Sequence, residues 1–311
     1  VTTSEGKYAP FIWRPNQSPK LQKLGSLGGG AGIATGVNVY SEVCGKSTTV
    51  DGLDRAFRWT PATGMEDLGV VLISPPHAHS FANGINDRGE IVGYSWGPPG
   101  DIRAFVWSED EGMSMVPSAG EGTRAQGING FSDIVGIQGG DEFSGIPDEG
   151  RVWRGEGAMY TIKNTLGGDV VTALAINDVP KVAGSAEDAE FREVAILWSK
   201  AAGMTKLEDF GWYIPGDNTG GFVAQAHGIN FFGDVVGEAV APSKASVHRV
   251  AALWRQGKIY DLNKLIPKGT EWTNLSSAEA INNKRCIAGI GTISGKGHAF
   301  LLAPVVLQKL T

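Results

Sequence analysis

The chain has 311 residues, a formal net charge of −6 and 45 glycines, about twice the usual share. This charge gives no general attraction to nucleic acid or to anionic lipid. No run of about 18 apolar residues occurs, so the sequence predicts no membrane-spanning helix. The chain begins at Val1 rather than at Met, as a processed or trimmed protein would, and it shows no recognisable signal peptide.

One pattern, A-x-[GA]-[IV]-N-x4-[IV]-x-G, occurs six times without an insertion or a deletion. Its copies span residues 34–45, 82–93, 125–136, 173–184, 226–237 and 278–289. Self-similarity at a regular period is the signature of a repeat architecture. The copies run from near one end of the chain to near the other with no linker between them. We therefore expect a single domain over residues 1–311.

Each repeat is predicted to contain two β-hairpins. In the first, A-x-[GA]-[IV]-N is a strand, the next residues turn, and [IV]-x-G is the returning strand. Asn suits the bend because its short amide can bond the backbone inside the turn. Trp marks the second hairpin, and we expect it to pack in the core between sheets. The six versions end at Trp13, Trp59, Trp107, Trp153, Trp198 and Trp254, and a seventh, His298-Ala-Phe-Leu-Leu302, has Leu in place of Trp.

Four antiparallel strands per 43 to 53 residues, measured from Asn to Asn, correspond to the blade of a β-propeller. The predicted fold class is therefore all-β, a six-bladed β-propeller of four-stranded antiparallel blades. One terminal hairpin is left over or pairs to close the ring. Second hairpins outnumber first hairpins by seven to six, so seven blades, one of them incomplete, are the alternative.

Only two cysteines are present, Cys44 and Cys286, and both fall on the second strand of the repeat. A closed ring would make the first and last copies neighbours, so a disulfide between these residues is one prediction. Two buried thiols are the prediction that we favour.

Four segments carry a family resemblance: Arg55-Ala-Phe-Arg-Trp59, Gly64-Met-Glu-Asp-Leu-Gly69, Gly84-Ile-Asn-Asp-Arg-Gly-Glu-Ile-Val-Gly93 and Gly297-His-Ala-Phe-Leu-Leu302. They resemble the HAF-type extracellular repeat proteins. The resemblance covers essentially the whole chain and implies an exported β-propeller, extracellular or periplasmic, in a family whose members mostly lack an assigned activity. The chain departs from the family where Arg-Ala-Phe or Ala-Ile-Leu replaces His-Ala-Phe. The family offers no catalytic residues that could be transferred to this chain.

Two of the four connections in each repeat vary in length, and in an up-and-down blade both emerge on the same face. Binding and catalytic residues are most often carried on such loops, although loop length can also drift without function. Exposed aromatic rings beside polar groups would suit a carbohydrate or another small ligand. The candidate ligand-binding residues on these loops are His77, His79, Trp96, Arg124, Trp212, Tyr213, Glu271 and Trp272.

The same loops give little reason to expect a metal. His77 and His79 alternate on an extended segment without a clustered third ligand, so no metal site is predicted there. Calcium stays an open alternative at Asp141, Glu142 and Asp217, although these residues do not have the ligand spacing of an EF-hand. No other cofactor is expected.

The second position of the pattern lies near the start of the predicted innermost strand. In chain order it is occupied by Thr35, Asn83, Gln126, Leu174, His227 and Glu279. Equivalent positions on six inner strands form a ring, so these mostly polar residues predict a polar collar at the mouth of the channel. His227 and Glu279 come from adjacent blades, and a carboxylate beside an imidazole can act in general acid–base catalysis. The alternative is that channel water simply solvates the collar.

The sequence leaves two functions open. The first is an exported protein that binds a carbohydrate or other small ligand on the variable face and at the channel mouth, with Thr35, Asn83 and Gln126 among the contacts; a protein partner is a further option. The second is an enzyme, a lyase, hydrolase or isomerase, with His227 and Glu279 as catalytic residues. No Ser-His-Asp spacing, phosphate-binding loop or dinucleotide fingerprint is present.

Overall fold

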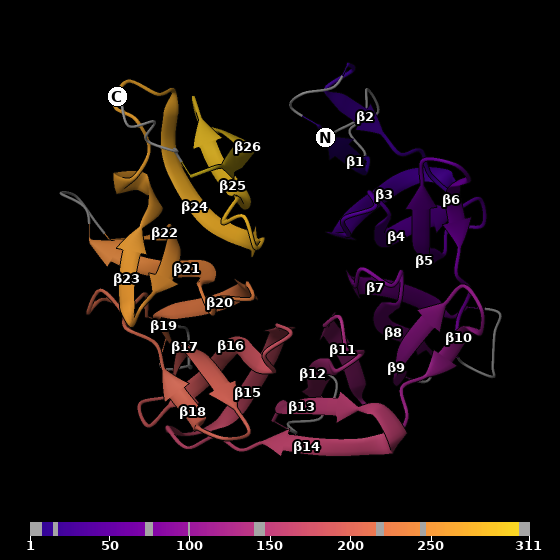
Figure 1. The fold of residues 1–311 in the computed structure, drawn as a ribbon, viewed down its shortest axis with the longest axis horizontal. Helices are drawn as coiled ribbons and strands as arrows, with labels where there is room; N and C mark the ends of the chain where they lie inside the picture. Colours follow the sequence, from indigo (N-terminus) through magenta and orange to yellow (C-terminus); the bar gives the residue numbers. More distant parts are fainter. Residues whose placement is uncertain are drawn as a thin grey trace, which may run out of the picture. The chain divides into compact units, whose positions relative to one another are not determined.

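The computed structural model is a six-bladed β-propeller of antiparallel sheets, which confirms the predicted fold class (Figure 1). It describes residues 8–14, 18–71, 77–98, 100–139, 147–215, 221–242 and 247–304. A seventh blade is not needed. Within these ranges, no helix has the length and apolar character that crossing a membrane would require.

The chain divides into two compact units. Unit 1 comprises Val1–Pro147 and Arg151–Tyr160, and unit 2 comprises Asp148–Gly150 and Thr161–Thr311.

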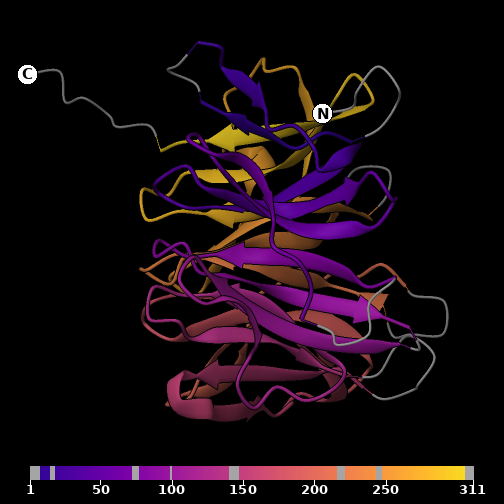
Figure 2. The same cartoon turned by 90° about the vertical axis from the view of Figure 1, so that its right-hand side faces the viewer.

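Unit 1 contains two complete blades and most of a third. Blade 1 consists of β3 (Gly28–Val37), β4 (Val43–Thr49), β5 (Asp54–Thr60) and β6 (Gly64–Asp67). Blade 2 consists of β7 (His79–Ile85), β8 (Ile91–Gly97), β9 (Asp101–Ser108) and β10 (Gly112–Met115). Blade 3 consists of β11 (Thr123–Ile128), β12 (Ile134–Gln138), β13 (Glu149–Arg154) and β14 (Ala158–Ile162), with the 3-10 turn η1 (Gly155–Gly157) before β14. Figure 2 shows the sheets of blades 1 and 2 lying next to each other.

Unit 2 contains the other three blades. Blade 4 consists of β15 (Gly167–Ile176), β16 (Lys181–Asp188), β17 (Arg192–Ser199) and β18 (Gly203–Lys206), and the short β19 (Gly221–Phe222) pairs in parallel with β17. Blade 5 consists of β20 (Ala224–Ile229), β21 (Val235–Pro242), β22 (Val247–Arg255) and β23 (Lys258–Asp261), followed by η2 (Leu262–Lys264). Blade 6 consists of β24 (Trp272–Ile281), β25 (Ile287–Ile293) and β26 (Lys296–Leu302).

The two chain ends depart from the four-stranded pattern. The sheet of blade 6 has three strands rather than the four expected, as far as the described residues extend. At the other end, β1 (Phe11–Trp13) and β2 (Leu21–Lys23) form a two-stranded sheet of their own, which corresponds to the leftover hairpin. Ile12 of this hairpin packs against the core of blade 1 beside Phe57 and Trp59.

The first Ala and the last Gly of the repeat face each other across the first hairpin of every blade. The pairs are Ala34–Gly45, Ala82–Gly93, Ala125–Gly136, Ala173–Gly184, Ala226–Gly237 and Ala278–Gly289. A Cβ added to Gly93 would lie 1.9 Å from the carbonyl oxygen of Phe81, and the other five glycines have a carbonyl oxygen within 2.2 Å. The last position of the repeat is therefore always glycine, because the opposite backbone leaves no room for a side chain.

A β-bulge occurs at the same place in all six first hairpins. The strand register shifts across the second position of the repeat, as between Ala226 and Gly228 in blade 5. A bulge leaves its extra residue out of the ladder and turns that side chain in a new direction. The residues at these bulges are Thr35, Asn83, Gln126, Leu174, His227 and Glu279, which are the predicted collar positions.

The Asn of each repeat ends the inner strand, and its side chain bonds the turn as predicted. In blade 2 the Oδ1 atom of Asn86 accepts from the backbone N–H groups of Arg88 and Glu90, both at 3.0 Å. Its Nδ2 donates to the carbonyl oxygen of Asn129 in blade 3 at 3.0 Å. The same link joins Asn38 to Asn86 at 3.2 Å and Asn177 to Asn230 at 2.8 Å. The turn residue therefore also connects neighbouring blades within each unit.

The Trp residues of the second hairpins are mainly core residues. Trp59, Trp107, Trp153 and Trp254 are buried, whereas Trp13 is exposed. Both cysteines are free thiols, so the disulfide alternative is wrong. Cys44 is buried in the core with Phe105 and Trp107, and this burial raises its pKa to about 12.

Replacing Gly93 by Ala tests the packing of the first hairpin. We expect Gly93→Ala to lower the free energy of unfolding by about 3 kcal/mol, because the new Cβ would collide with a backbone oxygen that cannot move alone. The matched control is Gly297→Ala on β26, where an added Cβ meets nothing within 4 Å; its effect should stay below about 0.5 kcal/mol. The unfolding free energies are measured by chemical denaturation. An equal loss in Gly93→Ala and Gly297→Ala would contradict the close packing at Gly93.

Candidate functional site

Six polar side chains of unit 2, on strands of blades 4, 5 and 6, form one hydrogen-bonded network. This His227 cluster consists of Ser185 on β16, Glu193 on β17, Gln225 and His227 on β20, and Ser277 and Glu279 on β24. His227 and Glu279 are bulge residues. Gln225 and Ser277 each precede a bulge residue by two positions, so the bulge geometry decides how the four side chains meet.

The contacts of Gln225 fix the orientation of its amide. A carboxylate can only accept, so the amide atom that faces the Oε1 atom of Glu193, at 2.8 Å, is the donor Nε2. The Oε1 atom of Gln225 therefore faces the Nε2 atom of His227, at 2.9 Å. An amide oxygen has no proton to give, so the Nε2 atom of His227 carries one.

The other side of the imidazole also meets acceptors. Nδ1 of His227 lies 3.4 Å from the Oε2 atom of Glu279 and 3.4 Å from the hydroxyl oxygen of Ser277. That hydroxyl donates its one proton to the Oε1 atom of Glu279 at 2.6 Å. Both neighbours of Nδ1 then require a donor, so the network is satisfied when His227 carries both protons and is positively charged.

The electrostatics of the cluster agree with this charge state. Burial of the imidazole opposes its charged form, but the hydrogen bond to Glu279 and the charges of Glu279 and Glu238 outweigh it, so the pKa of His227 is raised. The hydrogen bond from His227 lowers the pKa of Glu279, with help from Ser277. Burial raises the pKa of Glu238, although Arg249 pairs with it.

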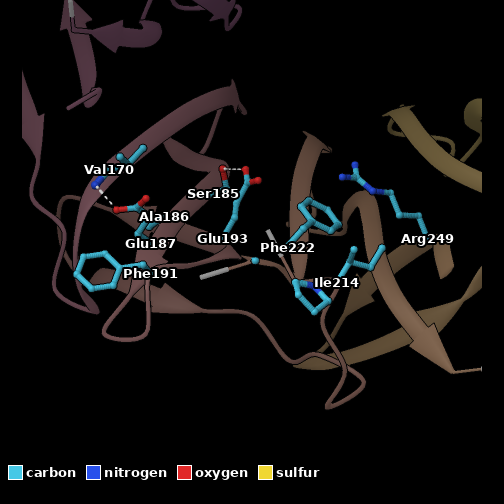
Figure 3. A pocket seen from close by; sticks show the side chains of 11 residues that line it. Val170, Ser185, Ala186, Glu187, Phe191, Glu193, Ile214, Phe222 and Arg249 are labelled. Carbon is cyan, nitrogen blue, oxygen red and sulfur yellow. Dashed lines mark hydrogen bonds between the residues drawn. The ribbon is translucent and has the colours of Figure 1, made fainter. Parts of the chain in front are cut away.

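A cavity of about 420 Å³ adjoins the cluster (Figure 3). Ser185 and Glu193 belong to both, and their side chains are joined by a hydrogen bond of 2.7 Å. The guanidinium of Arg249 lies 3.8 Å from the ring centroid of Phe222, which pairs with Glu193 in the sheet register. In Figure 3 the ring of Phe222 lies between the side chains of Glu193 and Arg249.

The cavity combines charged, hydroxyl and aromatic groups. Arg249 is ion-paired with the largely buried carboxylate of Glu238. The Oε2 atom of Glu187 accepts from the backbone N–H groups of Asp169 and Val170, at 3.3 and 3.4 Å. Phe191 adds an exposed ring at the cavity. Such a lining can hydrogen-bond a polar molecule while an aromatic face covers its apolar part.

The collar residues of unit 1 are engaged with backbone. The hydroxyl of Thr35 donates to the carbonyl oxygen of Ala82 at 2.8 Å, and the Nδ2 atom of Asn83 donates to that of Ala125, also at 2.8 Å. These bonds link successive inner strands of unit 1. Gln126 occupies the bulge of blade 3 and is half-buried.

Two of the other predicted residues of unit 1, His79 and Trp96, face each other on β7 and β8 of blade 2, whereas Arg124 lies on β11 of blade 3. Trp96 lies 5.3 Å from the ring of His79, whose Nδ1 accepts from the backbone N–H of Asp54 at 3.1 Å. Burial lowers the pKa of His79. Arg124 lies 5.9 Å from the ring of Tyr94. His77 is exposed, beside a segment outside the described ranges.

The predicted loop residues of unit 2, unlike His227 and Glu279, take no part in the hydrogen bonds of the His227 cluster. Trp212 and Tyr213 are exposed on the segment between β18 and β19, with the guanidinium of Arg192 at 5.9 Å from the ring of Tyr213. Glu271 is exposed at the start of β24. Trp272 packs edge-on against Phe300, with ring centroids 6.1 Å apart, and is partly buried against the core between blades 5 and 6.

Among the residues described, no three His, Cys, Asp or Glu side chains come together as metal ligands would. Asp141, Glu142 and Asp217, the residues considered for calcium, lie outside the described ranges.

Of the six residues of the His227 cluster, only His227 and Glu279 were predicted from the sequence. Gln225 and Ser277 could have been found, because the residue before the first Ala of the repeat becomes polar in the later copies. That position reads Ile33, Phe81, Arg124, Thr172, Gln225 and Ser277. Glu193 and Arg249 stand on third strands outside the repeated pattern, so no sequence signal pointed to them.

No protein-family model and no curated protein sequence matches the chain. Solved structures do resemble it. An acylaminoacyl peptidase of Pyrococcus horikoshii aligns with a TM-score of 0.54 and 11% identity, over 89% of this chain and 46% of the peptidase chain. This chain thus spans less than half the length of that peptidase.

Two other solved structures align over nearly their full length. Virginiamycin B lyase of Staphylococcus aureus gives a TM-score of 0.49 and 12% identity, over 98% of this chain and 97% of the lyase. A lectin of Aleuria aurantia, solved in complex with Fucalpha1-6GlcNAc, gives 0.39 and 12%, over 86% of this chain and 93% of the lectin. At such identities the similarity concerns the fold alone.

The raised pKa of His227 predicts a pH-dependent contribution to stability. A group whose pKa is raised by folding stabilises the native state fully below its unfolded pKa of about 6.5, and this stabilisation is lost as the pH rises through the folded pKa. The difference in unfolding free energy between the wild type and His227→Gln should therefore be larger near pH 6 than near pH 9. Urea unfolding at both pH values measures it.

The control is the same comparison in a Glu279→Gln background. Because the Glu279 carboxylate provides the main opposing charge, most of the pH dependence should disappear there. A difference between the wild type and His227→Gln that is equal at both pH values would show that His227 is not held as an imidazolium.

Proposed function

We propose that the protein binds a small polar ligand of the carbohydrate class in the cavity of unit 2. The observation that carries the proposal is the joint lining of that cavity by Ser185, Glu193, Arg249 and the rings of Phe191 and Phe222. Carboxylate and guanidinium groups bond sugar hydroxyls from fixed directions, and aromatic rings cover the apolar face of a sugar. The volume of about 420 Å³ also lies within the usual range for small-ligand sites.

The placement of the cavity supports the same proposal. Its residues Ile214, Pro215 and Phe222 belong to the long connection between β18 and β20, one of the variable loops on which we expected function. Behind the cavity, Glu193 is held by hydrogen bonds from Ser185 and Gln225, so its carboxylate is positioned before any ligand arrives. A positioned group costs less conformational entropy on binding.

A glycan array followed by titration calorimetry tests this proposal. The wild type should bind at least one sugar, and Glu193→Gln should weaken that binding about tenfold or more, because a charged hydrogen-bond acceptor is lost. The matched control Glu66→Gln changes an exposed carboxylate on β6 and should leave the affinity unchanged. Absence of sugar binding by the wild type, or equal loss in both variants, would contradict the proposal.

Acid–base catalysis is the second candidate function. It is favoured by the 3.4 Å approach of the Nδ1 atom of His227 to the carboxylate of Glu279, with Gln225 linking the imidazole to Glu193 in the cavity. A lyase, hydrolase or isomerase could use this pair. In the calorimetry samples, a chemical change in the bound sugar that His227→Gln abolishes without loss of binding would favour the enzyme; an unchanged ligand would exclude it for that sugar.

The resemblance to HAF-type extracellular repeat proteins and the extracellular or periplasmic location that it implies stay predictions. We propose export on the strength of that sequence resemblance. Recovery of the native protein from the cytosolic fraction alone would contradict this proposal.

A further inference from the structure

Two glutamates of the unit 2 cavity stand directly opposite each other on neighbouring strands. Glu187 on β16 and Glu193 on β17 are partners in the strand register, and both line the cavity. Directly opposite side chains project from the same face of a sheet, with Cβ atoms about 5 Å apart, and like charges placed in this way destabilise the sheet. A positive group beside the pair would remove this cost.

The arginines at and beside the cavity already have carboxylate partners. Arg249, which lines the cavity, is ion-paired with Glu238. Arg192, on the lining strand β17, makes hydrogen bonds of 3.0 and 2.8 Å to the carboxylate of Asp188. Within the described ranges, neither glutamate of the opposed pair forms an ion pair. The two negative charges at the cavity are therefore left without a positive partner in this part of the chain.

Each of the two carboxylates has one oxygen bonded to the protein and one that is not. The Oε2 atom of Glu187 accepts from two backbone N–H groups, and the Oε1 atom of Glu193 accepts from Ser185 and Gln225 (Figure 3). Among the described residues, no donor reaches the other oxygen of either carboxylate. Neither of these oxygens belongs to the buried atoms that lack a partner, so both are open to a molecule in the cavity.

We propose that the ligand of this cavity is an amino sugar whose free amine is protonated. Its ammonium group pairs with the carboxylates of Glu187 and Glu193, and its N–H groups donate to the two open oxygens. The ring of Phe191, which is exposed at the cavity, covers the apolar face of the sugar. The inference rests on the proposed function, because it names the class of sugar that the same cavity takes.

The charges select against the other classes of sugar. An acidic sugar would bring a third carboxylate beside Glu187 and Glu193, and such a placement of like charges costs binding energy. A neutral sugar would leave the opposed carboxylates without compensation. An amino sugar alone adds the positive group that the pair lacks.

Titration calorimetry with glucosamine and glucose tests the inference, since the two sugars differ only in an ammonium for a hydroxyl. At pH 6, where the amine of glucosamine is charged, the wild type should bind glucosamine about tenfold or more tightly than glucose, because an ammonium makes charge-assisted hydrogen bonds. Equal affinities would overturn the inference and leave sugar binding intact.

Glu187→Gln removes one charge of the pair without removing the acceptor for the backbone, because the amide oxygen still accepts from the N–H groups of Asp169 and Val170. The preference for glucosamine over glucose should fall to about threefold or less, with the affinity for glucose unchanged. The matched control Glu66→Gln, on β6, should keep the full preference. A full preference in Glu187→Gln would overturn the inference.

Cyclohexylamine, which has an ammonium but no hydroxyl, separates failure of this inference from failure of sugar binding. It should bind more weakly than glucosamine, because it lacks the hydroxyls that the cavity bonds. Binding as tight as that of glucosamine, without any binding of glucose, would support the ammonium site and contradict the carbohydrate class of the ligand. Absence of binding by both amines would overturn the inference, whether or not glucose binds.

Discussion

The structure depends on the hydrogen bond from the side chain of one turn Asn to the backbone of the next. Asn282 of blade 6 is exposed, but the turn Asn of each other blade is buried at the end of an inner strand, where its Oδ1 atom organises its own turn. Its Nδ2 atom then donates to the carbonyl oxygen of the corresponding Asn in the neighbouring blade, as from Asn38 to Asn86 and from Asn177 to Asn230. One residue type thus sets both the bend within a blade and the spacing between blades, which is why the turn never changes length.

The same constraint prepares the candidate site. With the turn fixed, the Ala–Gly pair can approach closely and the residue between them is left in a bulge. In unit 1 the bulge residues Thr35 and Asn83 use their side chains to bond the neighbouring blade. In unit 2 the bulge carries His227 and Glu279, whose side chains instead join a network leading to Glu193 and the cavity. In unit 2 this structural position of the repeat is therefore part of a polar network that adjoins the cavity.

The sequence predicted those features that every repeat shares. Six copies of one pattern were enough to predict six blades, the strand order within each hairpin and the buried Trp, because each is a local consequence of turn chemistry and packing. The bulge escaped prediction, since Ala-x-Gly has no spacing that separates a bulge from a regular strand. Glu193 and Arg249 could not be foreseen either, because they arise where one blade differs from the others. Trp272, expected at a ligand, packs in a core because His298 and Phe300 face it.

The unfolding free energy of Asn177→Asp tests the central link between blades most directly. This change keeps the Oδ1 acceptor for the backbone N–H groups of Val179 and Lys181 but sets an oxygen against the carbonyl of Asn230. Asn282→Asp is the control, since in the described part of the chain its side chain bonds only within its own turn. We expect a loss of about 2 kcal/mol or more for Asn177→Asp and less than about 1 kcal/mol for Asn282→Asp. Equal losses would contradict the role of the turn Asn in joining the blades.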